Sequence, residues 1–170
     1  NIFSKNSPLV VLGLQPNPDL TLKDTTHNIR ITCEFVVNLV DEDIASQMVA
    51  CAADFTRGEN ETNSAGLTLA QSENVDVDYI SKAPIALECR RVTVLQFAKT
   101  RDFSIGEIVG LHAREGVIDK DTLRVNCDTY NPIGRLYADQ YIRTHDRFSM
   151  SIPSHLDVIS GKYKTNIGEK

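Results

Sequence analysis

Lysine, aspartate and threonine side chains stand together at the expected start of a helix covering residues 22–31. Thr21 and Asp24 have the spacing of a helix N-terminus whose hydroxyl accepts a backbone N–H. The unpaired N–H groups and the dipole of a first turn favour an anion, so Lys23 and Thr25 could hold a phosphate. A capped, solvent-facing helix start would have the same local sequence, so both interpretations stay open on these residues alone.

A second candidate segment covers residues 130–141. Gly134 permits close approach of the backbone to a ligand, and Arg135 beside it carries a guanidinium that suits phosphate or carboxylate. Tyr137 and Tyr141 add flat side chains with polar tips. Arg135 could contact a bound nucleotide or form an ion pair at an interface, and the two hypotheses are evenly matched.

Composition limits the classes of protein to consider. The 170 residues are 41% hydrophobic, which suffices for one domain with a buried core. A net charge of −5 without a basic block argues against a nucleic-acid partner. No apolar run reaches the length of a membrane span and no secretory signal opens the sequence. We therefore expect a cytoplasmic protein with no nucleic-acid or membrane partner.

Cysteine and histidine spacing gives no metal motif. The four cysteines lie far apart, each in or near an apolar segment, so we expect buried, reduced thiols and no zinc site. The four histidines show no ligand spacing either. The sequence also lacks the Gly-x-Gly-x-x-Gly fingerprint of a Rossmann dinucleotide domain. The four cysteines are Cys33, Cys51, Cys89 and Cys127.

Hydrophobic periodicity predicts the elements that must position these residues. We expect Asp41 to cap the second helix. In the long strand at residues 83–97, the alternation of apolar residues between the two faces changes phase near Arg90 and Arg91, which predicts a bulge. The two longest strands should form an antiparallel hairpin, so the pattern indicates an α+β domain on an antiparallel sheet or barrel. The predicted strands are residues 8–14, 35–40, 83–97 and 103–113, and the predicted helices are residues 22–31 and 44–52.

Two polar residues of the long strands are interpreted as structural. His112 lies on the face opposite the apolar one, where a hydrogen-bonded structural histidine is the commoner outcome and contact with a cofactor the alternative. Glu88 stands in an apolar strand and needs a partner there. We expect that partner to be Arg90, Arg114 or a backbone group.

Several segments, taken in their order along the chain, resemble the flavin reductase-like family. They are residues 7–13, 23–25 with 28–29, 34–40, 65–68, 81–89, 105–112, and 132–136 with Tyr141. The resemblance implies a mainly β member of the α+β class: a split β-barrel of the FMN-binding type with a few flanking helices. It divides the chain into a domain at residues 1–152 and a C-terminal tail or dimer arm at residues 153–170. Family members carry further strands before the position of Asn1.

The resemblance also implies a homodimer with one FMN per subunit, FAD being the alternative, and NADH or NADPH as electron donor. Three implied residues match the segment near the flavin phosphate and ribityl chain: Lys23, Asp24 and Thr25. Asn1 matches a stretch beside the isoalloxazine ring. A C-terminal group matches the segment near the flavin: Gly134, Arg135 and Tyr141.

The implied activity is NAD(P)H-dependent reduction of FMN, with electrons passed to oxygen, a monooxygenase partner or another acceptor. Because the flavin carries this chemistry, no catalytic side chain is expected. One alternative is an FMN-binding electron carrier or sensor, and another is a cofactor-free split-barrel interaction module. Tyr137 and Ala138 replace glycines common in the family, which would narrow the space over the flavin.

Overall fold

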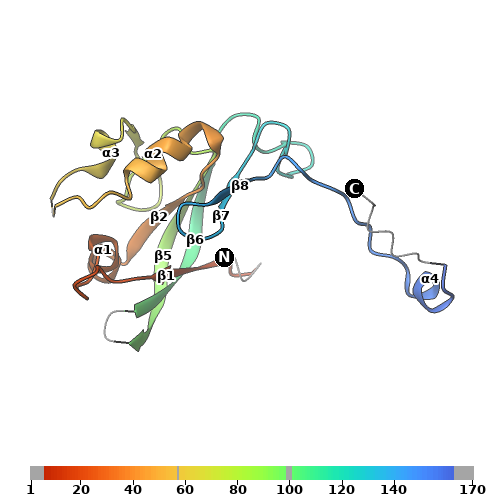
Figure 1. Ribbon diagram of the computed structural model, residues 1–170, viewed down its shortest axis with the longest axis horizontal. Helices are drawn as coiled ribbons and strands as arrows, with labels where there is room; N and C mark the ends of the chain where they lie inside the picture. Colours follow the sequence, from red (N-terminus) through yellow and green to blue (C-terminus); the bar gives the residue numbers. More distant parts are fainter. Residues whose placement is uncertain (1–5, 57, 99–100, 163–170) are drawn as a thin grey trace.

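The computed structural model describes residues 6–56, 58–98 and 101–162, and its main feature is a four-stranded antiparallel sheet (Figure 1). The strand order is β1-β6-β5-β2, so the long hairpin forms the centre and the two earlier strands form the edges. The bounds are β1 Leu9–Leu14, β2 Glu34–Asn38, β5 Ile85–Ala98 and β6 Arg101–Ala113.

Short elements surround this sheet. Helix α1 (Asp24–Thr32) precedes β2, and a 3-10 turn, η1 (Glu42–Ile44), leads into α2 (Ala45–Ala50). Two small hairpins add β3 (Leu69–Ala70) with β4 (Tyr79–Ile80), and β7 (Ile133–Arg135) with β8 (Tyr141–Arg143). The remaining helices are α3 (Glu61–Ser64) and α4 (His155–Ile159). Among the described residues, no helix has the length and apolar character that a membrane span requires.

The hydrophobic core connects the sheet to α1 and to the segment after β6. Side chains from all four strands pack there because each strand carries β-branched or aromatic residues at inward positions. Ile29 comes from α1, and Val117 and Tyr130 close the core from the loop that follows the hairpin. The buried members are Val10, Ile29, Phe35, Ile85, Leu87, Cys89, Val117 and Tyr130.

The buried face of β6 carries small and polar residues. Asp102, Ser104 and Gly106 are buried, whereas Phe103 on the other parity is 47% exposed. A Cβ at Gly106 would lie only 2.4 Å from Cζ of Phe35, so the glycine leaves room for that buried ring. The alternate positions of β6 that carry large apolar side chains, such as Phe103, therefore face outward.

The predicted bulge in the long hairpin is confirmed. The β5–β6 register shifts between Arg91 and Thr93, which leaves Val92 as the extra residue on β5. A second shift between Glu88 and Cys89 places an extra residue on β6. Such bulges bend a strand and increase its twist, and they let the long pair curve.

Two predicted helix caps are wrong. Helix α1 begins at Asp24 with Lys23 as its N-cap, and the Thr21 hydroxyl instead donates to Asp19 Oδ1 at 2.7 Å. Asp41 precedes η1 but makes no cap hydrogen bond to a described residue, because its buried carboxylate accepts from Arg114 at 2.6 Å. In both cases another partner competes for the side chain that could have capped the helix.

The expectation of buried thiols holds for Cys89 alone. Cys33 and Cys51 are half-buried and Cys127 is exposed, although all four are free. Cys127 lies in a turn-rich segment outside the core, and so its apolar neighbours in the sequence do not enclose it.

Candidate flavin site

A cavity of about 590 Å³ opens beside the N-terminus of α1. Three segments that are far apart in the sequence meet there: the end of β1, the start of α1 and the turn between β7 and β8. The cavity is lined by Gly13, Leu14, Gln15, Lys23, Thr25, Thr26, Arg135, Tyr137 and Ala138.

The start of α1 supplies the polar wall of this cavity. Lys23 is the N-cap residue, and no described side chain caps the helix by a hydrogen bond. First-turn N–H groups have no acceptor within the helix, so this end attracts an anion, and the ammonium of Lys23 adds a full charge. Lys23 and Thr25 line the cavity as predicted, whereas Asp24 belongs to the same turn but is not among the lining residues.

Arg135 lines the same cavity from the end of β7. Its Nε and Nη2 donate to the carbonyl oxygen of Ala138 at 3.1 and 2.8 Å. A backbone hydrogen bond from Leu136 N–H to the Gln140 carbonyl, at 3.0 Å, closes the same turn. The guanidinium therefore holds the turn that places Tyr137 and Ala138 at the cavity, a third role besides the two hypotheses from the sequence.

A more apolar hollow of about 340 Å³ adjoins the cavity, because Arg135 lines both. Tyr141 lies in this hollow and not in the polar cavity. Gly134 lines neither space; a Cβ there would lie 2.9 Å from Cγ2 of Ile142, so its small size serves the packing of β8. The hollow is lined by Asn38, Leu39, Val40, Met48, Val49, Ala52, Ile133, Arg135 and Tyr141.

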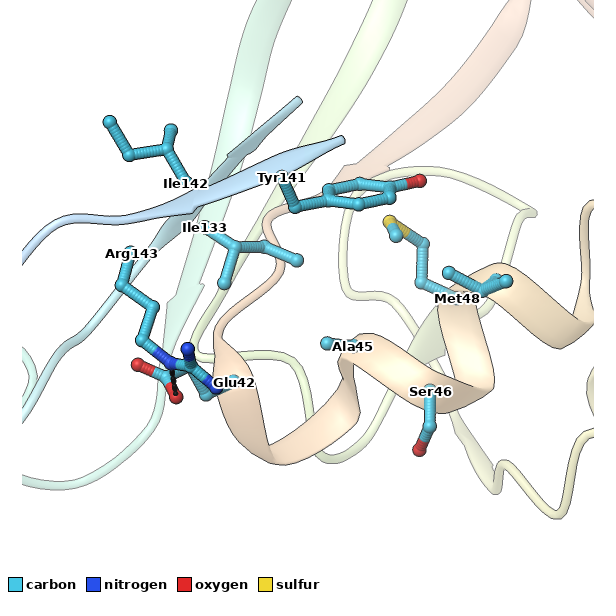
Figure 2. A pocket seen from close by; sticks show the side chains of 9 residues that line it. Glu42, Ala45, Ser46, Met48, Ile133, Tyr141, Ile142 and Arg143 are labelled. Carbon is cyan, nitrogen blue, oxygen red and sulfur yellow. Dashed lines mark hydrogen bonds and ion pairs between the residues drawn. The ribbon is translucent and has the colours of Figure 1, made fainter. Parts of the chain in front are cut away.

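A third hollow, of about 290 Å³, lies between α2 and the β7–β8 hairpin, and we call it the α2–β8 groove. Figure 2 shows Tyr141 and Met48 pointing toward one another, with Ile133 beside them and the Glu42–Arg143 ion pair at the other end. The Arg143 hydrogen bond lowers the pKa of Glu42 below its ordinary value. The groove is lined by Glu42, Ala45, Ser46, Met48, Val49, Ile133, Tyr141, Ile142 and Arg143.

Glu88 and His112 form a separate buried cluster. Glu88 is completely buried and accepts the N–H groups of Glu73 (2.9 Å) and Asn74 (2.6 Å), together with a hydrogen bond from His112 Nε2. The His112 ring stacks on Tyr79 with centroids 4.2 Å apart. Neither Glu88 nor His112 lines the three spaces above. The cluster therefore has a structural role: it holds the loop before β4 against β5 and β6.

The predicted partners of Glu88 were partly right. A backbone partner is confirmed, whereas the two arginines are engaged elsewhere: Arg90 pairs with Glu34 at 3.6 Å and Arg114 pairs with Asp41. Burial opposes ionisation of Glu88 and raises its pKa. The donors from Glu73, His112 and Asn74 outweigh that effect and hold the pKa at about 2.

Sequence reasoning missed part of the cavity wall. Gly13, Leu14 and Gln15 lie at the end of β1, and only the folding of the chain brings them to α1 and the β7–β8 turn. No local spacing signals this contact. Asn1, which the resemblance placed beside the flavin ring, lies outside the described residues.

Comparison with known proteins gives the family. Residues 2–134 match the model of the flavin reductase like domain. The 2-nitrobenzoate 2-nitroreductase of Pseudomonas fluorescens is 39% identical with a TM-score of 0.82, over 91% of this chain and 74% of that chain. Nitrilotriacetate monooxygenase component B from Bacillus cereus is 29% identical with a TM-score of 0.81, over 88% of this chain and 75% of that chain.

An uncharacterized protein of Deinococcus radiodurans is 34% identical over 151 residues, which cover 88% of this chain. The match spans 66% of that relative, so the chain corresponds to about two thirds of the relative's length.

The structural similarity to solved flavin reductase-like proteins confirms the predicted split-barrel fold. The chain belongs to the flavin reductase like family. It is therefore a flavin-binding oxidoreductase by family. The division of the chain at residues 152 and 153 stays a prediction.

Proposed function

We propose that this protein reduces FMN with NADH or NADPH as electron donor, FAD being the alternative flavin. One observation carries the proposal: Lys23, Thr25 and the uncapped start of α1 share a cavity with Arg135, and an apolar hollow adjoins that cavity. Spaces of about 300–1,000 Å³ with few polar groups are typical of ligand sites. Their sizes and polarity suit a phosphate at one end and a flat ring at the other.

The residues present fit FMN at each end. Lys23 and the first-turn N–H groups would hold the phosphate dianion, because a helix N-terminus supplies both donors and a favourable dipole. Met48, Val49 and Ile133 would pack against the ring and exclude water from it. The flavin, when bound, supplies the acceptor for hydride transfer.

The other contributions of the chain are positional. Arg135 closes the turn carrying Tyr137 and Ala138, and this turn limits access to the cavity. Tyr141 borders the apolar hollow from β8. Because hydride transfer needs no proton donor on the protein, orientation and exclusion of water are the protein's share of the work.

The proposal includes a homodimer. Large apolar side chains on the outward face of the hairpin support it, with Phe97 and Leu111 among those exposed. A monooxygenase as acceptor is supported by the similarity to nitrilotriacetate monooxygenase component B, which is one part of a multi-component system by its name. The cytoplasmic location and the absence of nucleic-acid and membrane partners stay predictions.

A nitroaromatic acceptor is the second candidate. The 39% identity to 2-nitrobenzoate 2-nitroreductase over 91% of the chain favours it, together with the apolar hollow beside Tyr141. NADH consumption is measured with FMN present and 2-nitrobenzoate added or omitted. Consumption that rises with the nitro compound and is matched by its loss supports this acceptor, and an unchanged rate contradicts it.

The first experiment is an absorption spectrum of the protein with added FMN, desalted, and then mixed with NADH in the absence of oxygen. Retained flavin bands that bleach with NADH are the expected result. Bands that persist with both NADH and NADPH would instead support an electron carrier or sensor. If no flavin is retained, turnover with excess FMN decides, and absence of both binding and turnover would contradict the proposal.

A further inference from the structure

A small polar pocket of about 200 Å³ adjoins the α2–β8 groove, and no step of the proposed function uses it. We call it the Asp41 pocket. Glu42 lines both this pocket and the groove, whereas the lining of the pocket has no residue in common with the flavin cavity or the apolar hollow. The polar side chains that matter for its chemistry are Asp41, Glu42, Asp43, Arg114, Asn131 and His145.

Asp41 leaves one hydrogen-bonding position open in this pocket. Its side chain is only 4% exposed, and its Oδ2 accepts a hydrogen bond from Arg114 Nη2 at 2.6 Å. The other oxygen, Oδ1, is buried and has no hydrogen-bond partner among the described residues. Because a buried carboxylate oxygen without a donor is costly, the pocket favours a ligand that brings an O–H or N–H group.

The positive charges around the pocket are already matched by carboxylates. Arg114 pairs with Asp41 and also lies 3.8 Å from Asp43, measured from Nη1 to Oδ2. Glu42 accepts from Arg143 Nε at 2.8 Å, and its other oxygen pairs with His145 Nε2. No cation of this group is left over for a phosphate, so the pocket suits an uncharged part of a ligand.

The side-chain amide of Asn131 supplies both a donor and an acceptor. It makes no hydrogen bond to a described residue, so its N–H groups and its oxygen are available to a ligand. A hydroxyl group also donates and accepts, and two neighbouring hydroxyls could serve Asp41 Oδ1 and Asn131 together. The pocket is smaller than the 300–1,000 Å³ typical of a site for a whole ligand, and its size suits a single sugar ring.

We propose that the Asp41 pocket binds the 2′,3′-diol of the adenosine ribose of the electron donor, and thereby selects NADH over NADPH. This inference rests on the proposed function, which supplies the dinucleotide. In other dinucleotide sites a carboxylate accepts a hydrogen bond from the ribose 2′-hydroxyl of NADH, whereas an arginine accommodates the 2′-phosphate of NADPH. Here the arginine is paired with Asp41 and Asp43, and a 2′-phosphate would be repelled by both carboxylates.

The α2–β8 groove connects this pocket to the flavin site. Figure 2 shows Tyr141 and Met48 at one end of the groove and the Glu42–Arg143 ion pair at the other. Tyr141 and Met48 also line the apolar hollow assigned to the flavin ring, and Glu42 also lines the Asp41 pocket. A dinucleotide lying along the groove would have its nicotinamide toward the flavin and its adenosine ribose toward Asp41. The arrangement therefore points to the adenosine ribose, which is the one that carries the 2′-phosphate in NADPH.

Isothermal titration calorimetry with ADP-ribose and 2′-phospho-ADP-ribose tests the site without any turnover. Both are titrated into the protein in the presence of excess FMN, which keeps them out of the flavin cavity. We expect ADP-ribose to bind at least tenfold more tightly than its 2′-phosphate. Equal affinities, tighter binding of the 2′-phosphate, or no binding of ADP-ribose would overturn the proposal.

Two variants locate the binding. Asn131→Ala should weaken ADP-ribose binding at least threefold, as expected for a lost hydrogen bond. Asp43→Asn should narrow the difference between the two ligands at least threefold by removing one repelling charge. The Asp43 side chain is 80% exposed, so the fold should persist, which circular dichroism checks. Asp54→Asn is the matched control, because Asp54 is exposed and lines none of the four spaces. Wild-type affinities in both pocket variants, or the same change in the control, would overturn the assignment.

Steady-state kinetics with FMN then connects the pocket to the reaction. The ratio of kcat/KM for NADH to that for NADPH should be at least ten in the wild type and at least threefold lower in Asp43→Asn, mainly through KM for NADPH. A preference for NADPH in the wild type would overturn the proposal. If neither nucleotide is oxidised while the titrations give the expected affinities, the proposed activity fails and the ribose site stands, so the two failures are distinguishable.

Discussion

Glu88 is a completely buried carboxylate whose hydrogen-bond donors come from strand β6 and from a loop. The Glu73 and Asn74 N–H groups belong to the loop before β4, and His112 belongs to β6. Because every donor is lost when the chain unfolds, the ionised form is more stable in the folded state. Its folded pKa of about 2 lies below the ordinary value of 4.5.

Glu88→Gln should lower the free energy of unfolding by about 1.5–3 kcal/mol at neutral pH, because an amide cannot accept all the donors now satisfied. Since the folded pKa is depressed, the advantage of the wild type is fully present above pH 4.5 and disappears as the pH falls toward about 2. Urea denaturation of both proteins across this range measures the difference. A constant difference down to the lowest pH would contradict the assigned ionisation.

Lys23→Ala should weaken FMN binding about tenfold or more, as expected for a lost hydrogen bond to a charged group. Riboflavin has no phosphate, so its affinity should change little. Fluorescence titration with both ligands measures this contrast. Lys120→Ala is the control, an exposed lysine that does not line the cavity. Equal losses for FMN and riboflavin would assign Lys23 to another part of the ligand.

Among the elements, β6 depends most on close packing. It lies between β1 and β5, and its buried face carries no large side chain between Asp102 and Gly106. The Phe35 ring of β2 fills the space that Gly106 leaves, which connects the edge strand to the centre of the sheet. A glycine is needed at position 106 because any larger side chain would take the space of the Phe35 ring, and the conformational freedom of the glycine backbone is secondary there.

Gly106→Ala should lower the free energy of unfolding by about 1–3 kcal/mol, because the added methyl overlaps the Phe35 ring. Gly13→Ala is the comparison within the same sheet, where a Cβ would meet Phe103 at an ordinary 3.4 Å. Thermal denaturation of both variants gives the ranking. A Gly106 variant as stable as the Gly13 variant would show that Phe35 moves aside at no cost.

For the molecule as a whole, the candidate site connects parts of the chain that the sheet does not join directly. The cavity draws on β1, α1 and the β7–β8 turn, and a ligand seated there would hold these segments together. A ligand that binds only the folded state stabilises it by mass action. Flavin binding and overall stability are therefore linked.

FMN at one hundred times its dissociation constant should stabilise the protein by about 2.7 kcal/mol. For a chain of this length, that corresponds to a rise in Tm of about 5–10 °C. Differential scanning calorimetry with and without FMN measures the shift, with AMP as a control for nonspecific binding of a nucleotide phosphate. No shift at saturation, despite retained flavin, would mean that FMN binds the unfolded chain as well as the folded one, which contradicts a site built by folding.

Short-range signals predicted much of the secondary structure. Alternation located the edge strands and the long hairpin, and the change of phase near Arg90 predicted the bulge found at Val92. Those signals work because the periods of strands and helices are local. The caps at Thr21 and Asp41 failed because a nearer acceptor in one case, and a distant arginine in the other, took the side chain.

The sequence by itself determined the resemblance to a flavin family, the helix start at Lys23 and Thr25, and the need of Glu88 for a partner. Only the tertiary structure decided that the small face of β6 is buried, that Arg135 holds Ala138, and that Tyr141 borders a separate hollow. The physical reason is reach: propensity and capping act within a few residues, whereas a cavity wall or the partner of a buried charge depends on atoms that folding brings within contact distance.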